Sequence, residues 1–156
     1  MLKAPPGRSP GGAQGTIHPL LTVIDAVMLL WIAIAGALGA LARYGLAGLA
    51  HVFFGARLPW GTLVVNLTGC FLLGLLSEVA ARTGWVGAEL RAAAAIGFLG
   101  SFTTFSTFAL ESFRSLEAGD WVGAASNIGL NVAGGLMLVF LGILSARWML
   151  TLRGPL

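Results

Sequence analysis

The chain has 156 residues, of which 57% are hydrophobic and only 10% are charged, and its mean hydropathy is +0.90. A soluble domain carries about 25% charged residues, so this composition excludes a water-exposed globular domain. The net charge of +3 comes from few residues without a Lys/Arg cluster, which argues against a nucleic-acid partner. We therefore predict an all-α membrane protein whose main surroundings are membrane lipid.

The N-terminal residues 1–22 are rich in Pro and Gly, and we predict a disordered extension there. Lys3 and Arg8 precede an apolar run, as in a signal peptide, but this run is too long for one and predicts a retained helix. Met28 is an alternative translation start. Residues 23–150 are predicted to form one transmembrane domain, and residues 151–156 a C-terminal tail.

Four apolar runs are long enough to cross a membrane, which takes about 20 residues. They are Val23–Leu46, Thr62–Ala81, Leu90–Phe113 and Trp121–Ala146. Arginines near the predicted helix ends divide four against three between the two sides of the membrane, which is a weak orientation signal. We predict a four-helix bundle that could insert both ways.

Small residues are frequent in the predicted helices, as in "AIAGALGALARYG" of the first and at Gly69 and Gly74 of the second. In lipid, small residues let helices approach closely. The glycines therefore predict a tight bundle or an oligomer. Cys70 is predicted to be a small apolar residue, while His18 and His51 are isolated and are interpreted as interfacial or solvated.

The third run contains "GFLGSFTTFSTF", which holds five hydroxyl side chains and four phenylalanines and opens with two glycines three residues apart. Gly97 and Gly100 predict a helix break near the middle of the membrane, where irregular backbone is tolerated only inside protein or along a watery cavity. Carbonyl groups freed by such a break are natural cation ligands.

Helical spacing divides this third run into two predicted stripes. One is aromatic and the other polar, and they hold Phe98, Phe102, Phe105 and Phe108, and Ser101, Thr104, Thr107 and Glu111, respectively. The alternative for the hydroxyl groups is a bond back to their own helix carbonyls. Five hydroxyl groups in seven residues, followed by a carboxylate, favour a polar track.

Asparagines on the neighbouring helices could extend this track. Thr62 and Asn66 share a face of the second helix, and Asn127 and Asn131 share a face of the fourth. Each Asn could instead be interhelical glue, and Arg43 could extend to the membrane interface. Amides, hydroxyls and aromatic edges present positive partial charge, so the track favours a small anion.

Three segments, "GALGALARYG", "PWGTLVVNLTGCFLLG" and "GFLGSFTTFSTFALE", resemble the Fluc (CrcB) fluoride channels, and the resemblance extends from Ala35 to Gly142. It implies an antiparallel, dual-topology homodimer in the cell membrane that lets fluoride leave the cell down its gradient and so lowers cytoplasmic fluoride. It also implies a central structural Na⁺ that is not transported. The protein would not be an enzyme.

The resemblance also implies roles for individual residues. The fluoride pore would contain Asn66, Phe105 and Phe108, with the track groups Thr62, Thr107 and Glu111 and the vestibule residue Arg43. Backbone carbonyls of Gly100 and Thr103 would hold the Na⁺. Many members have Tyr and Ser in the fourth helix where this chain has Asn127 and Asn131, and we place both in the track.

Two other functions compete with the channel. A small four-helix multidrug or cation exporter of dual topology would need a carboxylate in the middle of a helix, whereas the first helix has only Asp25, at its start. A passive assembly subunit would account for the glycines but not for the polar track.

Overall fold

The computed structural model describes residues 19–55 and 58–152, with side chains from Ala26 onward, and these residues form helices joined by short links. Four segments are long and apolar enough to cross a membrane: Ala26–Phe54, Trp60–Arg82, Ala88–Glu117 and Trp121–Thr151. The predicted all-α fold with four spans is confirmed. Most of the predicted extension, residues 1–18, lies outside the described residues, as does most of the tail.

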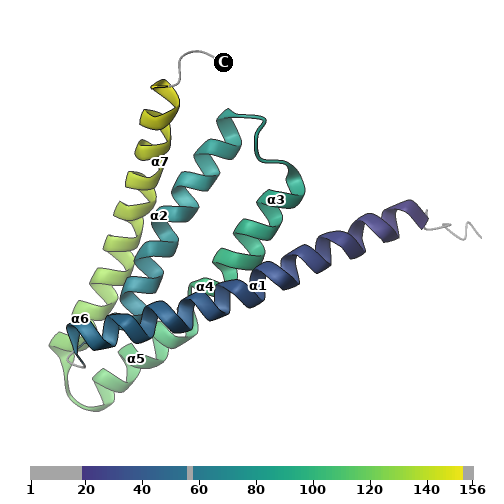
Figure 1. Ribbon diagram of the computed structural model, residues 1–156. Coiled ribbons are helices and arrows are strands. Elements are labelled where there is room, and N and C mark those ends of the chain that lie inside the picture. The colour runs from purple at the N-terminus through teal and green to yellow at the C-terminus, as the bar shows by residue number, and fades with distance from the viewer. Residues whose placement is uncertain (1–18, 56–57, 153–156) are drawn as a thin grey trace, which may run out of the picture.

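The first span belongs to α1 (Pro19–Phe54), a 36-residue helix that crosses the other helices (Figure 1). It ends where Gly55 adopts a left-handed conformation (φ 73°) and its N–H bonds to the carbonyl of His51 at 3.0 Å. The helix continues eight residues beyond the predicted end at Leu46. Arg43 therefore lies inside the span and not near its end, because the sequence up to Phe54 remains apolar.

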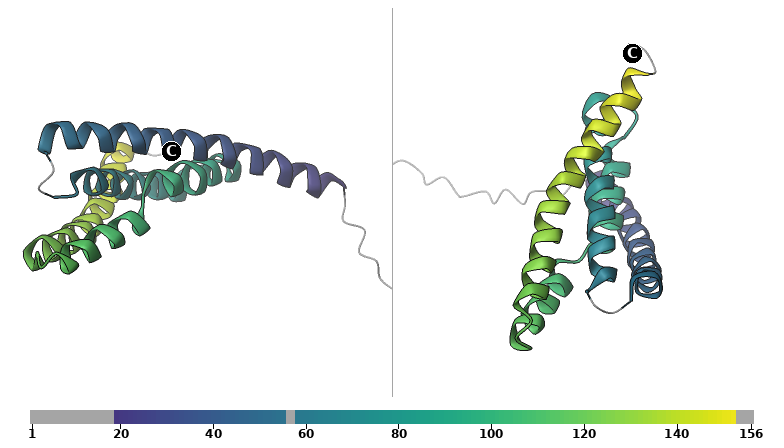
Figure 2. Two further views of the ribbon diagram at one scale, coloured as in Figure 1. Left: turned by 90° about the horizontal axis from the view of Figure 1, so that it is seen from below. Right: turned by 90° about the vertical axis from the view of Figure 1, so that its left-hand side faces the viewer.

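The second span is α2 (Trp60–Arg82), which runs beside α7 (Gly135–Thr151) (Figures 1 and 2). Two glycines make this close packing possible. A Cβ at Gly74 would overlap the backbone of Val139, and one at Gly142 would overlap the carbonyl of Phe71. The prediction that glycines allow tight packing holds at these two positions.

The third span is composed of four helical pieces: α3 (Ala88–Ala92), the π-helix η1 (Ala93–Leu99), α4 (Gly100–Phe102) and α5 (Phe105–Glu117). Between α4 and α5, Thr103 (φ −80°, ψ 158°) and Thr104 (φ −147°, ψ 110°) are extended. The predicted interruption of this helix is present, but at a different place.

The prediction that Gly97 and Gly100 break the helix is wrong. Gly97 lies within η1, and Gly100 has ordinary helical angles (φ −63°, ψ −35°). Gly97 serves packing instead, since a Cβ there would lie 2.7 Å from the carbonyl oxygen of Ile32 and 2.9 Å from the Cβ of Ala35. Likewise, a Cβ at Gly39 of α1 would overlap the carbonyl of Phe98.

The fourth span starts with α6 (Trp121–Gly129), continues through the π-helix η2 (Leu130–Gly134) and ends with α7. The carboxylate of Asp120 accepts a hydrogen bond from the N–H of Gly123 at 2.8 Å and so caps α6. Near the C-terminal end of α7, Arg147 donates to Glu78 of α2 at 2.7 Å, and Arg82 also binds this carboxylate.

The surface of the bundle is largely apolar, and many large hydrophobic side chains are exposed on every span. In α1, only 6% of the most apolar stretch is buried within the chain. The cores of soluble proteins bury such residues, whereas lipid or a second protein chain can cover them here.

Candidate functional site

The side chain of Asn66, on α2, holds the extended break of the third span. Its Oδ1 accepts a hydrogen bond from the N–H of Thr104 at 2.8 Å, and its Nδ2 donates to the carbonyl of Thr104 at 3.2 Å. In a continuous helix, that N–H would bond to the carbonyl of Gly100. The Asn66 amide thus replaces helical bonding and stabilises the break.

Thr104 then begins the next helix as the N-cap of α5. Its hydroxyl accepts a bond from the N–H of Thr107 at 3.3 Å and donates to the hydroxyl of Thr107 at 2.8 Å. The N–H of Thr107 would otherwise bond to the carbonyl of Thr103. The N–H groups that would bond to the carbonyls of Gly100 and Thr103 in a continuous helix are therefore bonded elsewhere.

The four phenylalanines of the predicted aromatic stripe form two separate pairs. Phe98 and Phe102 are stacked with their ring centres 5.7 Å apart, and Phe105 and Phe108 meet edge to face at 5.5 Å. The predicted single stripe is wrong, because the two extended threonines between the pairs interrupt the helical spacing. Phe108 is buried, whereas 78% of Phe105 is exposed.

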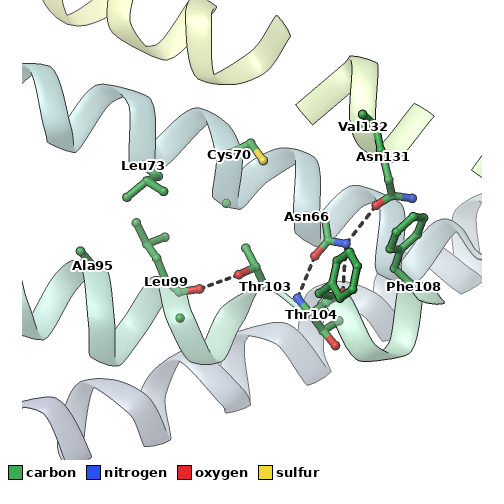
Figure 3. Close-up of a pocket in the computed structure, with 13 residues that line it drawn as sticks. Asn66, Cys70, Leu73, Ala95, Leu99, Thr103, Thr104, Phe108, Asn131 and Val132 are labelled. Carbon is green, nitrogen blue, oxygen red and sulfur yellow. Dashed lines mark hydrogen bonds between the residues drawn. The ribbon is translucent and has the colours of Figure 1, made fainter. Parts of the chain in front are cut away.

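A cavity of about 320 Å³ lies at the break. Its walls include Asn66, Thr104, Phe105, Phe108 and Asn131, together with the candidate cation ligands Gly100 and Thr103 (Figure 3). Most of the lining is apolar, and its polar groups are neutral amides and hydroxyls. Such a cavity can present hydrogen-bond donors and ring edges without introducing a full charge.

A directed chain of hydrogen bonds continues from Asn66 into the fourth span. Asn66 donates to Oδ1 of Asn131 at 2.9 Å, Asn131 donates to Oδ1 of Asn127 at 2.9 Å, and Asn127 donates to the hydroxyl of Ser112 at 2.9 Å. Ser112 bonds back to the carbonyl of Phe108 at 2.8 Å. Both asparagines of the fourth span, Asn127 and Asn131, thus join the polar group around Asn66.

Ser112 is a residue of this group that the sequence does not predict. It lies outside the hydroxyl stripe, and its position four residues after Phe108 predicts only an ordinary bond back to its own helix. Burial makes it important, since Ser112 is 5% exposed and Asn127 2%. A buried amide needs a partner, and Ser112 supplies it.

Thr62 and Glu111 form a second polar contact, between α2 and α5. The Thr62 hydroxyl donates to Oε1 of Glu111 at 2.8 Å, while Oε2 of Glu111 is buried without a hydrogen-bond partner among the described residues. His51 of α1 interacts electrostatically with Glu111. The His51 side chain is exposed, in agreement with its interpretation as an interfacial or solvated residue.

Arg43 is separate from these contacts. Its side chain makes no hydrogen bond or ion pair with any residue in the described ranges. Arg43 lines a shallow surface hollow of α1 together with His51. The structure thus brings Asn66, Asn127 and Asn131 together, and it joins Thr62 to Glu111. The association of Arg43 with the track stays a prediction.

Four apolar spans, a broken helix and a cavity whose polar groups are neutral are typical of a small membrane protein of the channel or transporter class. Residues 30–143 match the family described as "CrcB-like protein, Camphor Resistance (CrcB)". The chain belongs to this CrcB (FluC) family.

Curated relatives agree with this assignment. A "Fluoride-specific ion channel FluC" of Geobacter metallireducens is 51% identical over 116 residues, which cover 74% of this chain and 94% of that protein. Proteins with the same description from Geobacter sulfurreducens and Nitrosococcus oceani are each 49% identical, covering 76% and 73% of this chain and 96% and 91% of the relatives.

Proposed function

We infer that this chain is a fluoride-specific ion channel of the cell membrane. The observation that carries this conclusion is 51% identity, over nearly the whole of the relative, to a protein described as a fluoride-specific channel. The four apolar spans are consistent with it. Such a channel is a non-enzymatic transporter that lets fluoride leave the cell down its gradient and so lowers cytoplasmic fluoride.

The cavity at the break is our candidate for the fluoride pathway. Asn66 would donate hydrogen bonds in place of lost water, and the rings of Phe105 and Phe108 would offer positive edges to the anion. Thr107 extends this donor set at the start of α5, and Asn127 and Asn131 border it from the fourth span. Neutral donors suit a small anion, because they stabilise it without holding it too tightly.

Thr62 and Glu111 would continue the pathway beyond the asparagines, and Arg43 would attract anions into its vestibule. Thr62 and Asn66 lie one helical turn apart on α2, which supports a continuous track on that face. The positive charge of Arg43 would raise the local concentration of anions around its side chain.

The test is fluoride efflux from liposomes that contain the purified protein, followed with a fluoride electrode. We expect rapid loss of fluoride and negligible loss of chloride, measured in parallel with a chloride electrode. Proton-coupled uptake of a lipophilic cation without fluoride efflux would contradict the proposal and point to a small exporter.

We further propose that two chains assemble as an antiparallel homodimer. The exposed apolar side chains, the exposed Phe105 and the cavity at the break all support coverage by a second chain. Opposite insertion relates the two copies by a two-fold axis in the membrane plane. The nearly balanced arginines permit both orientations.

Labelling of a single cysteine tests this arrangement. In a Cys70→Ala background, Leu152→Cys at the exposed end of α7 should react with an impermeant reagent from both sides of the membrane. Labelling from only one side of intact cells would contradict dual topology.

We also propose a structural Na⁺ at the carbonyls of Gly100 and Thr103. Both carbonyls lose their helical donors at the break, and both residues border the cavity. Neutral oxygen ligands suit a hard cation. When bound, the ion would supply positive charge beside the fluoride path without being transported.

Sodium removal tests this site in two independent ways. After prolonged dialysis into an N-methylglucamine buffer, we expect a lower melting temperature in detergent and little fluoride efflux. Returning Na⁺ should restore both. Unchanged stability and full efflux without sodium would contradict the site but leave the fluoride function intact.

A further inference from the structure

The amide of Asn66 has no hydrogen left for an additional acceptor. A side-chain amide has two N–H donors. One points to the carbonyl of Thr104 at 3.2 Å and the other to Oδ1 of Asn131 at 2.9 Å, while its own oxygen accepts from the N–H of Thr104 (Figure 3). An anion that binds Asn66 must therefore displace one of these two acceptors.

Asn131 is the easier of the two to displace. The carbonyl of Thr104 belongs to the backbone, and the N–H of the same residue is held by Asn66 as well. Asn131, in contrast, reaches Asn66 through a half-buried side chain that lies in the cavity wall. Rotation of a side chain requires far less rearrangement than movement of the backbone at the helix break.

The neighbouring residues fix the direction in which Asn131 points. Its nitrogen donates to Oδ1 of Asn127 at 2.9 Å and to the carbonyl of Asn127 at 3.0 Å. Asn127 is held in turn by the buried hydroxyl of Ser112 at 2.9 Å. With its nitrogen bound on this side, Asn131 presents its oxygen to Asn66.

We propose that the oxygen of Asn131 competes with the permeating anion for one N–H of Asn66, and that the Asn127–Ser112 pair sets the strength of this competition. The inference rests on the proposed fluoride function and adds a specific role for Asn131. In the resting state, Asn131 satisfies the Asn66 amide. When fluoride arrives, it takes over that N–H, and Asn131 turns away while Asn127 still holds its nitrogen.

Two substitutions of Asn131 should have opposite effects. Asn131→Ser has a side chain too short to keep the same contact, so the N–H becomes free for the anion, and fluoride efflux should rise about threefold to tenfold. Asn131→Asp keeps an acceptor and adds negative charge, so efflux should fall at least about tenfold. A purely structural role predicts that both substitutions reduce efflux.

Ser112→Ala supplies a second test that leaves Asn131 unchanged. Without the Ser112 hydroxyl, Asn127 is less firmly held, and Asn131 loses part of its alignment. We expect fluoride efflux to rise about twofold. Ser112→Thr keeps the hydroxyl and should behave like the wild type.

The experiment compares fluoride efflux of these variants from liposomes at several fluoride concentrations, with dimer content checked by gel filtration. Ser145→Ala is the matched control, because among the described residues the hydroxyl of Ser145 bonds only to the carbonyl of Leu141 in its own helix. The account predicts a lower half-saturating fluoride concentration for Asn131→Ser and a higher one for Asn131→Asp.

Each failure has a distinct meaning. If the wild type releases no fluoride, the proposed function is wrong. If the wild type conducts but Asn131→Ser is no faster and its half-saturating concentration is unchanged, the competition is overturned while the channel function stands. If Asn131→Ser does not assemble, Ser112→Ala decides, and efflux at or below the wild-type rate overturns the proposal.

Discussion

Two interfaces made by α2 differ in their polar contacts. Against α7, Gly74 and Gly142 let backbones touch, and among the described residues the polar contacts are limited to the Glu78–Arg147 pair at one end. Against the third span, Gly69 also packs closely, on Thr103, but α2 adds the polar side chains of Thr62 and Asn66. Close packing fills the first interface, whereas the second leaves a cavity.

The difference follows from the physics of helices in lipid. Apolar helices gain no hydrophobic free energy from leaving lipid, so contact between backbones must stabilise α2 against α7. An irregular backbone, in contrast, is stable in a membrane only where its polar groups find partners. Asn66 provides such partners for Thr104. The interface of α2 with α7 therefore stabilises the bundle, and the interface of α2 with the third span stabilises the break.

The largest structural effect is expected at the glycine interface. In Gly142→Ala, the new methyl group would overlap the carbonyl of Phe71 and lie 2.9 Å from the backbone nitrogen of Leu75. Separation of the helices should cost about 1–3 kcal/mol. Thermal unfolding in detergent, monitored by gel filtration, measures this loss of stability.

Gly129→Ala is the control for that substitution, since a Cβ there has no neighbour within 4 Å among the described residues. The control should be as stable as the wild type. Equal stability of Gly142→Ala and Gly129→Ala would show that the α2–α7 contact is looser than described.

A difference of similar size is expected between two glycines of one segment. Gly97→Ala should destabilise the protein by about 1–3 kcal/mol, because its methyl group meets the backbone of Ile32 and the side chain of Ala35. Gly100→Ala should not, because Gly100 is helical and the nearest neighbour of a Cβ among the described residues, the carbonyl oxygen of Ala95, is 3.6 Å away. Melting temperatures of the two variants should differ accordingly, and the reverse order would place the break at Gly100.

The break itself is the next target. Thr104→Ala removes the hydroxyl that caps α5 and should cost about 1 kcal/mol. Thr104→Ser keeps the hydroxyl and should recover most of that stability. Equal melting temperatures of the Ala and Ser variants would mean that the cap contributes little to the break.

The smallest effect is expected for the N-terminal extension. A chain that begins at Met28 keeps most of the apolar span Ala26–Phe54, which at 1.5 Å per residue exceeds the roughly 30 Å of the hydrocarbon core. Dimer yield and fluoride efflux should match the full chain. A large loss of either would show that residues 1–27 have a structural role.

The four spans could be predicted from sequence because apolar run length is a local property. The location of the break could not. Glycines are the local signal of a break, but Gly97 and Gly100 are helical, and the break lies at Thr103 and Thr104. Its cause is the amide of Asn66, 38 residues earlier in the sequence, and such a long-range contact leaves no local pattern.

In the candidate site, too, local patterns could be predicted from the sequence and long-range contacts could not. Asn66, Asn127 and Asn131 could be selected because an amide in a membrane span needs partners. Their order along one chain of hydrogen bonds, and the role of Ser112 at its end, depend on the relative position of three spans. The electrostatic influence of His51 on Glu111 depends on how far α1 continues beyond Leu46.

Fluoride efflux of Asn66→Asp, with Ser145→Ala as the control, tests the central claim most directly. An aspartate can still accept from the N–H of Thr104 but cannot donate to an anion, and its charge repels fluoride in a site of low dielectric. We predict efflux at least about tenfold slower than that of the wild type, in a protein that assembles as the wild type does. Efflux equal to that of the wild type would show that Asn66 only joins the helices and that fluoride passes elsewhere.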